Sequence, residues 1–168
     1  NVTLSDETMV TSMSRIKNGF KIEIMRDKEY KTIYADFVLL ASGGIGRVYK
    51  YTTNSSIATG DGIRLAYELG ANIKDLDYIQ FHPTAFASGE GRERFLISEA
   101  VRGEGAYLLN CNFERFMHRY DDRLELAPRD KVSHSIIMES RKTGSDKFYL
   151  DISRLDSEFL KNRFPLIY

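Results

Sequence analysis

Apolar and polar side chains alternate along the first forty residues, which is the pattern of strands that turn one face to a core. In the segment GFKIEIMR, polar residues separate the apolar Phe20, Ile22 and Ile24. The charged stretch DKEYK then predicts a turn, and TIYADFVLLA predicts a further strand that ends fully apolar and is therefore of the buried type. Residues 1–40 are thus predicted to form a β-meander.

A glycine-rich turn, SGGIG, follows the apolar strand. Gly43, Gly44 and Gly46 permit positive φ and let the backbone approach a ligand closely. A buried strand that ends in small residues and glycines is typical of dinucleotide-binding domains, where the ligand lies at the carboxyl edge of the sheet. The turn does not match GxGxxG, and glycine turns after strands are also common without any ligand, so both interpretations stay open.

A helix is predicted next in TTNSSIATGDGIRLAYELGA, from about Thr59 or Asp61 to Gly70. Its apolar positions at helical spacing are Ile63, Ala66, Tyr67 and Leu69. Asp61 either caps the free amides at the beginning of the helix, or these amides and its carboxylate face a ligand. The spacing leaves this alternative open.

The pattern changes after residue 80 from alternating strands to polar loops and helices. A domain boundary is therefore predicted near Tyr78–Phe81, with domains 1–79 and 80–168. The clearest helix is predicted in APRDKVSHSIIMESRKTG, with Pro128 in its first turn and Gly144 after a basic last turn. Its predicted apolar stripe consists of Val132, Ile136, Ile137 and Met138. The segments KFYLDIS and DSEFLKNRF predict a strand and a short helix.

Composition narrows the class of protein. Lys and Arg total 24 and so do Asp and Glu, so no net field attracts nucleic acid or an anionic membrane. The longest apolar run, FVLLA, is far shorter than the roughly twenty residues that span a bilayer, which predicts a soluble, cytoplasmic protein. The single cysteine, Cys111, excludes an internal disulfide and fits a reducing compartment. The chain begins NVTLSDETMV, without a methionine, and is therefore expected to be part of a longer protein.

The candidate chemistry lies in the second half of the chain. His82 stands in an FHPT turn, where Pro83 fixes the backbone and so orients the imidazole. Ser98 and Glu99 open the segment SEAVRGEG; if this is a helix, the Ser98 hydroxyl and the first-turn amides can receive an anion. Arg129 stands at the beginning of a helix, where the macrodipole disfavours a cation, and a carboxylate ligand held by its planar guanidinium would explain the placement.

Structural roles are the alternative for several of these side chains. Glu99, Arg102 and Glu104 could instead pair with one another on a solvated face. His118 and His134 are predicted to be surface or packing residues. No CxxC, HExxH or acidic loop with metal-ligand spacing occurs, so no metal is predicted, and no G-x-S-x-G elbow supports a hydrolase.

Six segments carry a resemblance to a known family by their order and intervals: ASGGIGRVYKYTTN, TGDGIRLAYELGA, QFHPTAF, FLISEAVRGEGAYLLN, ERFM and ELAPRDKVSHSI. Together they resemble the flavoproteins of the succinate dehydrogenase and fumarate reductase family, from about Phe37 to Tyr168. The segments RGEGAYL, LAPRD and LDIS resemble the family's L-aspartate oxidase branch more than its dehydrogenase branch, which usually has the sequences RGEGG and LASRD.

The resemblance implies a mixed α/β and α+β fold in two parts. Residues 1–79 would be the later part of a Rossmann-like FAD-binding domain with a β-meander, and residues 80–168 most of an α+β capping domain. A small dicarboxylate, L-aspartate, would lie between the cap and non-covalently bound FAD, with fumarate as a possible electron acceptor. The implied activity is the oxidation of L-aspartate to iminoaspartate for quinolinate and NAD biosynthesis, with a possible functional link to quinolinate synthase.

The resemblance also implies roles for particular side chains. His82, Ser98 and Glu99 match the family's substrate-binding residues, with Ser98 where threonine is more common. Arg129 matches the catalytic arginine that the family uses for proton transfer at the substrate carbon. Because a guanidinium has a pKa above about 12, we expect Arg129 to act as an electrostatic clamp rather than as a base. The positions that line the flavin are matched by Ala41, Gly43, Gly44 and Asp61.

Some parts of the family pattern do not occur in this sequence. The family's GxGxxG segment would lie before Asn1, and a further substrate-binding histidine and arginine would lie after Tyr168. The chain alone is therefore expected to retain FAD poorly and to be inactive. Two alternatives stay open: a flavoprotein of the succinate dehydrogenase or fumarate reductase branch, and a non-catalytic module that keeps the cap fold.

Overall fold

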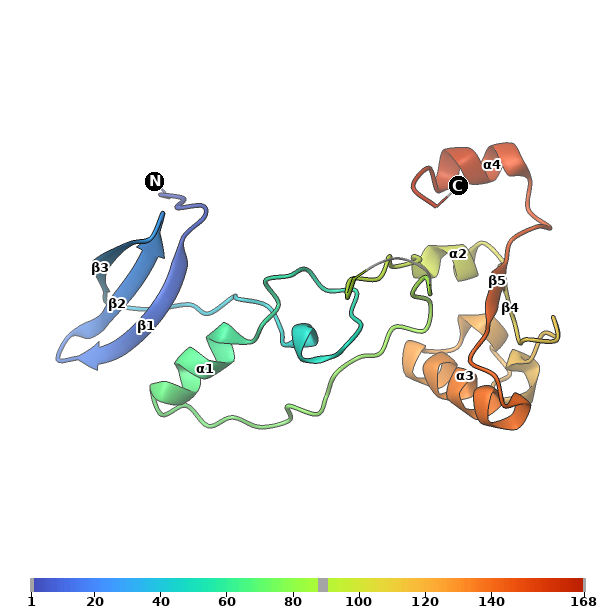
Figure 1. Ribbon diagram of the computed structural model, residues 1–168, viewed down its shortest axis with the longest axis horizontal. Helices are drawn as coiled ribbons and strands as arrows, with labels where there is room; N and C mark the ends of the chain where they lie inside the picture. The colour runs from blue at the N-terminus through green and yellow to red at the C-terminus, as the bar shows by residue number, and fades with distance from the viewer. Residues whose placement is uncertain (1, 88–90, 168) are drawn as a thin grey trace. The chain divides into compact units, whose positions relative to one another are not determined.

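The computed structural model describes residues 2–87 and 91–167, and the chain divides into two compact units, Asn1–Tyr78 and Ile79–Tyr168 (Figure 1). Among the described residues, the first unit contains a three-stranded sheet and one α-helix, and the second contains three α-helices and a two-stranded sheet. The predicted mixture of α and β structure is therefore confirmed.

The first unit begins with the predicted meander. Strands β1 (Met9–Ile16), β2 (Gly19–Arg26) and β3 (Glu29–Ala35) pair antiparallel in the order β1-β2-β3. The turn between β2 and β3 is shorter than predicted. It consists of Asp27 and Lys28, which both have positive φ, as a two-residue turn with the twist of a hairpin requires. The alternating apolar residues of β2 face a small core that also contains Met13, Leu65 and Leu69.

The strand predicted over TIYADFVLLA is confirmed only up to Ala35, where β3 ends, and its apolar end at residues 37–41 is neither a strand nor buried. Residues 37–45 have no regular secondary structure, and the side chains of Phe37 and Leu39 are 90% and 92% exposed. A strand that is apolar on both faces needs neighbouring strands and a cover on each side. Among the described residues, β3 pairs with β2 alone, so nothing extends the sheet over this segment.

The glycine turn lies against the beginning of helix α1 (Asp61–Glu68). A Cβ atom on Gly62 would come within 1.9 Å of the Ser42 hydroxyl oxygen, and one on Gly60 within 2.9 Å of the Ile45 side chain. This close contact requires glycine at both positions. The helix begins and ends as predicted, but its buried side chain is Leu65, while Tyr67, one of the apolar positions at helical spacing, is 69% exposed.

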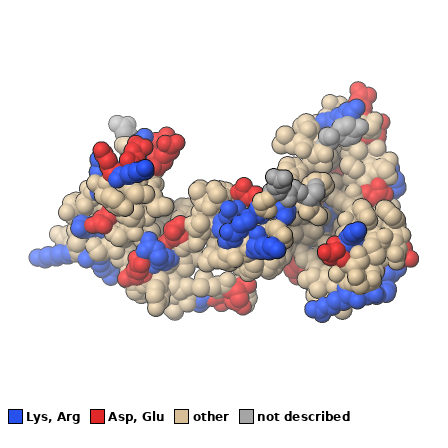
Figure 2. Space-filling view, viewed as in Figure 1, with Lys and Arg blue, Asp and Glu red and all other residues tan. Residues whose placement is uncertain are grey.

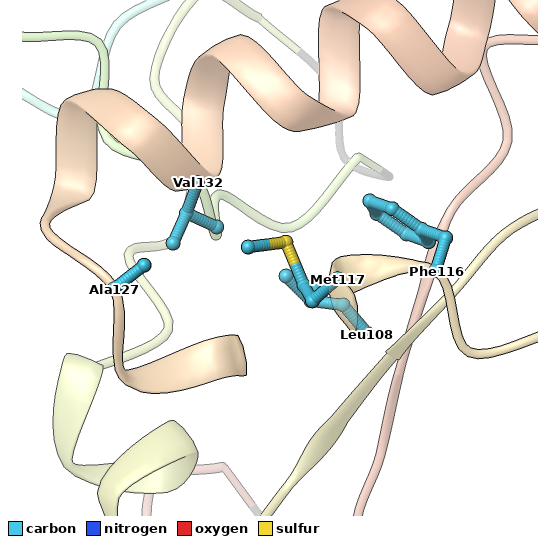
Figure 3. Packing of buried hydrophobic residues seen from close by; sticks show 5 residues of the cluster. All are labelled: Leu108, Phe116, Met117, Ala127 and Val132. Carbon is cyan, nitrogen blue, oxygen red and sulfur yellow. The ribbon is translucent and has the colours of Figure 1, made fainter. Parts of the chain in front are cut away.

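The second unit is built around helix α3. Its elements are α2 (Glu99–Gly103), β4 (Tyr107–Leu109), α3 (Arg129–Thr143), β5 (Tyr149–Asp151) and α4 (Ser157–Arg163), with β4 and β5 antiparallel. The main core cluster consists of Leu108, Phe116, Met117, Ala127 and Val132, which Figure 3 shows between α3 and strand β4. A second cluster joins α2 to α4 through Val101, Ala106, Leu160 and Phe164.

Helix α3 has the predicted ends and a different buried face. Gly144 follows it with φ +67, the left-handed conformation that glycine adopts most easily. Val132 is buried as predicted, whereas the predicted stripe residues Ile137 and Met138 are 51% and 38% exposed. The remaining fully buried positions are polar, Ser135 and Glu139.

Glu139 is 0% exposed, and hydrogen bonds to its carboxylate compensate for the loss of water. It accepts from Asn110 Nδ2 at 2.9 Å, from Arg119 Nη1 at 2.8 Å and from the Tyr120 hydroxyl at 2.7 Å. These hydrogen bonds and the Arg119 charge hold the pKa of Glu139 below its ordinary value, against the raising effect of burial. The ionised carboxylate therefore fastens the segment 110–120 to α3.

Both signs of charge are scattered over the visible face of each unit (Figure 2). Within residues 2–87 and 91–167, no helix combines the length and the apolar character needed to cross a bilayer.

Candidate active site

Arg129 is the first residue of α3 and makes two side-chain hydrogen bonds. Its Nε donates to Glu99 Oε2 at 2.6 Å, and its Nη1 donates to Gln80 Oε1 at 3.0 Å. The Glu99 carboxylate offsets the unfavourable position of a cation at a helix N-terminus. The side chain of Arg129 is 41% exposed, and within the described part of the chain its third nitrogen, Nη2, makes no hydrogen bond. Arg129 can therefore still bind an external carboxylate.

Glu99 lies between two guanidinium groups. Its Oε1 is 3.3 Å from Arg102 Nη2, on the side away from its bond to Arg129. The Arg129 hydrogen bond is the main cause that lowers the pKa of Glu99, and the charges of Arg129 and Arg102 add to it. Glu99 is therefore ionised, and the three side chains together carry one net positive charge.

The alternative in which Glu99, Arg102 and Glu104 pair on a solvated face holds only in part: Glu99 does pair with Arg102, but Arg102 is not solvated. Its side chain is 1% exposed, and its Nη1 donates to the backbone carbonyl of Glu125. Burial lowers the pKa of Arg102, while the nearby Glu99 carboxylate opposes this shift. Glu104 pairs instead with Arg163 of α4, at 3.1 Å.

His82 lies beside this charge cluster and is half-buried. Its Nδ1 is 3.3 Å from the backbone N–H of Thr84, which donates to it across the FHPT turn. Burial lowers the pKa of His82, and the positive charges of Arg129 and then Arg102 lower it further. The imidazole is therefore neutral at neutral pH and can donate or accept a hydrogen bond without adding charge.

Ser98 caps helix α2, a structural role that was not predicted from the sequence. Its hydroxyl oxygen accepts from the Ala100 N–H at 3.2 Å, and its side chain is exposed. Since the hydroxyl hydrogen is not used in this bond, Ser98 can cap the helix and also donate to a ligand.

The structure thus brings His82, Glu99 and Arg129 together, with Ser98 next to Glu99 in the chain. Sequence reasoning missed Gln80 and misplaced Arg102. Gln80 precedes His82 by two residues, so its place in the same turn was the available signal. Arg102 follows Glu99 by three residues on a helix, a spacing that puts the two side chains on one face.

The four predicted flavin-lining residues all lie in the first unit. Ala41, Gly43 and Gly44 are exposed, and a Cβ atom on either glycine would meet nothing within 4 Å. Asp61 is the first residue of α1; its carboxylate accepts from the Thr59 hydroxyl and does not cap the helix. Because Ser42 packs on Gly62, the open glycine backbone lies next to the first turn of α1. This arrangement fits a flat, anionic ligand such as a dinucleotide.

The other reactive side chains lie outside these sites. His118 and His134 are exposed, as predicted, and Cys111 is a half-buried free thiol. Among the residues that the structure describes, no three histidine, cysteine or acidic side chains form a group that could hold a metal ion.

The lowered pKa of His82 makes stability depend on pH in a defined window. Because the unfolded chain binds a proton near pH 6.5 and the folded chain does so only at lower pH, the free energy of unfolding should fall as pH drops below about 6.5. Urea unfolding at pH 7.5 and 5.5 should show a larger loss for the wild type than for His82→Gln. The lowered pKa of Glu99 acts separately, at a pH below 4.5. Equal losses in the two proteins would contradict the assignment.

Comparisons with known proteins agree with this picture. The chain is 53% identical over 144 residues to L-aspartate oxidase of Clostridium perfringens, covering 85% of this chain and 31% of that protein. It is 42% identical over 165 residues to a subunit of the fumarate reductase (CoM/CoB) of Methanothermobacter marburgensis, covering 94% of this chain and 30% of that protein. A solved quinol-fumarate reductase with menaquinol molecules matches with a TM-score of 0.83 and 32% identity, over 96% of this chain and 31% of that chain.

The chain spans about a third of the length of these relatives. The model of the FAD binding domain family matches residues 2–168, which is nearly all of the sequence. The chain therefore belongs to the FAD binding domain family of flavoprotein oxidoreductases, together with the L-aspartate oxidases and the flavoproteins of fumarate reductase and succinate dehydrogenase.

Proposed function

We propose that this chain is part of a flavoprotein that oxidises L-aspartate to iminoaspartate with FAD as the hydride acceptor. The observation that carries the proposal is the half-exposed guanidinium of Arg129, held by Glu99 and Gln80 next to His82. This arrangement leaves hydrogen-bond donors for a carboxylate in a site of net positive charge. The identity of 53% to an L-aspartate oxidase supports the choice of substrate.

In this proposal His82, Ser98 and Arg129 hold the substrate. Arg129 binds one carboxylate through its unused nitrogen and acts as the catalytic clamp, since a guanidinium stays protonated and is a poor base. His82 and the Ser98 hydroxyl donate hydrogen bonds to the oxygens of the substrate. Glu99 binds no carboxylate itself; it orients Arg129 and keeps the net charge of the cluster at plus one. The protein's share of catalysis is then alignment of the Cα–H bond and stabilisation of the charged ends.

The cofactor would be held by the open glycine backbone of the first unit. Ala41, Gly43 and Gly44 would allow close approach of FAD, and Asp61 would accept a hydrogen bond from one of its hydroxyl groups. When bound, FAD supplies the acceptor for the hydride. Residues 1–79 would accordingly belong to the FAD domain and residues 80–168 to the substrate cap.

Succinate or fumarate is the second candidate for the substrate. Two comparisons favour this candidate: the structural match to quinol-fumarate reductase and the 42% identity to the fumarate reductase subunit of Methanothermobacter marburgensis. A carboxylate clamp at Arg129 suits either diacid. The higher identity to L-aspartate oxidase makes L-aspartate the first choice.

Steady-state assays of the flavoprotein that contains this chain test the proposal. Adding L-aspartate should cause release of hydrogen peroxide or fumarate-dependent turnover. L-Alanine, which lacks the second carboxylate, should be a poor substrate. A functional link to quinolinate synthase would require iminoaspartate as the product. Oxidation of succinate with no response to L-aspartate would reject L-aspartate and support the second candidate.

A further inference from the structure

Thr84 connects the two segments that carry the proposed substrate-binding residues. It is 5% exposed, and its hydroxyl donates to the backbone carbonyl of Ile97 at 2.9 Å. The Ile97 N–H donates back to the Thr84 carbonyl at 3.0 Å, and the next pair along, Phe86 N–H to the Phe95 carbonyl, is 2.9 Å apart. These bonds form a short antiparallel ladder. His82 lies two residues before Thr84, and Ser98 lies one residue after Ile97. Both residues therefore lie at the end of the ladder that the Thr84–Ile97 pair forms.

Thr84 also determines which nitrogen of His82 carries the hydrogen. Its backbone N–H is a fixed donor, 3.3 Å from Nδ1. Its hydroxyl oxygen is 3.5 Å from the same nitrogen, but the hydroxyl hydrogen is used in the bond to Ile97. A backbone N–H can only donate, so its bond to Nδ1 leaves this nitrogen as the acceptor; the hydroxyl oxygen, which could accept from an Nδ1–H, is the more distant of the two groups. The neutral ring then carries its hydrogen on Nε2.

A second bond orients the same turn from helix α3. The Ser133 hydroxyl donates to the Phe81 carbonyl at 2.6 Å. Ser133 follows Arg129 by four residues, which places the two side chains on one face of α3. The FHPT turn is therefore held on one side by the ladder at Thr84 and on the other by the helix that carries the guanidinium.

We propose that Thr84 is a positioning residue that keeps His82 in the Nε2–H tautomer and directs this hydrogen at a substrate carboxylate. The substrate part of this statement rests on the proposed function, whereas the tautomer belongs to the chain alone. A histidine with its hydrogen on Nδ1 would present a lone pair to the carboxylate and repel it.

Nitrogen-15 NMR of the histidine rings in the 168-residue chain, above the pKa of His82, tests the tautomer. In the wild type and in Thr84→Ser, His82 Nδ1 should resonate as an unprotonated nitrogen and Nε2 as a protonated one. Thr84→Val keeps the backbone N–H but removes, at nearly constant shape, the hydroxyl bond to Ile97 that holds this N–H on Nδ1, so the two shifts should move toward each other as tautomers mix. Thr143→Val is the matched control, because it removes a threonine hydroxyl that also donates to a backbone carbonyl, at the far end of α3. It should leave His82 unchanged.

Protonated Nδ1 in the wild type would overturn the proposal even if every variant failed to fold. It would equally be overturned by a Thr84→Val protein that keeps the backbone spectrum and unchanged His82 shifts. In the flavoprotein holoenzyme, Thr84→Val should raise KM for the dicarboxylate about tenfold with little change in kcat, because one hydrogen bond to a charged group is weakened. If the shifts behave as expected while no dicarboxylate is oxidised, the proposed function fails and the tautomer assignment stands.

Discussion

Arg129→Leu is expected to lower kcat/KM for L-aspartate about a thousandfold in the flavoprotein that contains this chain. The loss corresponds to about 4 kcal/mol of transition-state stabilisation. The reason is twofold. The substitution removes the donor aimed at the substrate carboxylate, and it leaves Glu99 as a negative charge paired only with Arg102. The cluster then has no net positive charge with which to attract a diacid.

Steady-state kinetics with matched variants separate this effect from general damage. Arg129→Lys keeps the charge but loses the planar guanidinium that bonds to Glu99 and Gln80 at the same time. It should therefore be more active than Arg129→Leu and less active than the wild type. Arg123→Leu is the control, because Arg123 is an exposed arginine of the same unit that pairs with Asp121 at 2.9 Å. The kcat/KM of Arg123→Leu should stay within about threefold of the wild-type value. Near-normal L-aspartate oxidation by Arg129→Leu would remove Arg129 from the catalytic machinery and favour the non-catalytic alternative for the chain.

Much of the fold could be predicted from the sequence, because strand alternation and helix ends depend on residues that are close to one another in the chain. The alternation around Ile22 predicts a strand with one buried face, and Gly144 marks the end of α3 by its left-handed conformation. The apolar run at 37–41 could not be placed in the same way. Apolar residues indicate that a segment is buried somewhere, but the strands that would pair with it are not specified by the run itself.

The face of α3 shows a second limit of pattern reasoning. Periodicity selects apolar residues and so predicts Ile137 and Met138 as core, whereas Glu139 is the residue that is 0% exposed. A buried carboxylate is stable only because Asn110 and Tyr120 reach it from other parts of the chain. Such partners are remote in sequence, so no local pattern signals them.

In the candidate site, too, the features that depend on neighbouring residues were predicted and the contacts between remote residues were not. The FHPT turn and the placement of Arg129 at a helix start are local features, and both were visible in the sequence. The partners of Arg129 were not, because Glu99 and Gln80 lie 30 and 49 residues away. The sequence suggested a carboxylate ligand as a reason for the placement of Arg129, and the folded chain shows that Glu99 already provides one carboxylate.

The largest loss of stability is expected for Phe116→Ala in the second unit. Phe116 is 0% exposed, and its ring packs edge-on against Tyr120 and Phe148, with ring centroids 6.1 and 5.6 Å away. Removing a fully buried ring costs about 3–5 kcal/mol, through lost burial and the cavity that remains. Since small domains have a total stability of about 5–15 kcal/mol, this substitution should remove much of the stability of the unit.

Urea unfolding of the 168-residue chain, followed by far-ultraviolet circular dichroism, measures this loss, because the chain has no tryptophan to serve as a fluorescent probe. Leu126→Ala is the matched control, since Leu126 is 66% exposed in the same unit and should change the free energy of unfolding by less than about 0.5 kcal/mol. A loss below about 1 kcal/mol for Phe116→Ala would mean that the neighbouring side chains close the space left by the ring. Helix α3 would then be held mainly by the polar network of Glu139, and Glu139→Ala would become the more damaging substitution.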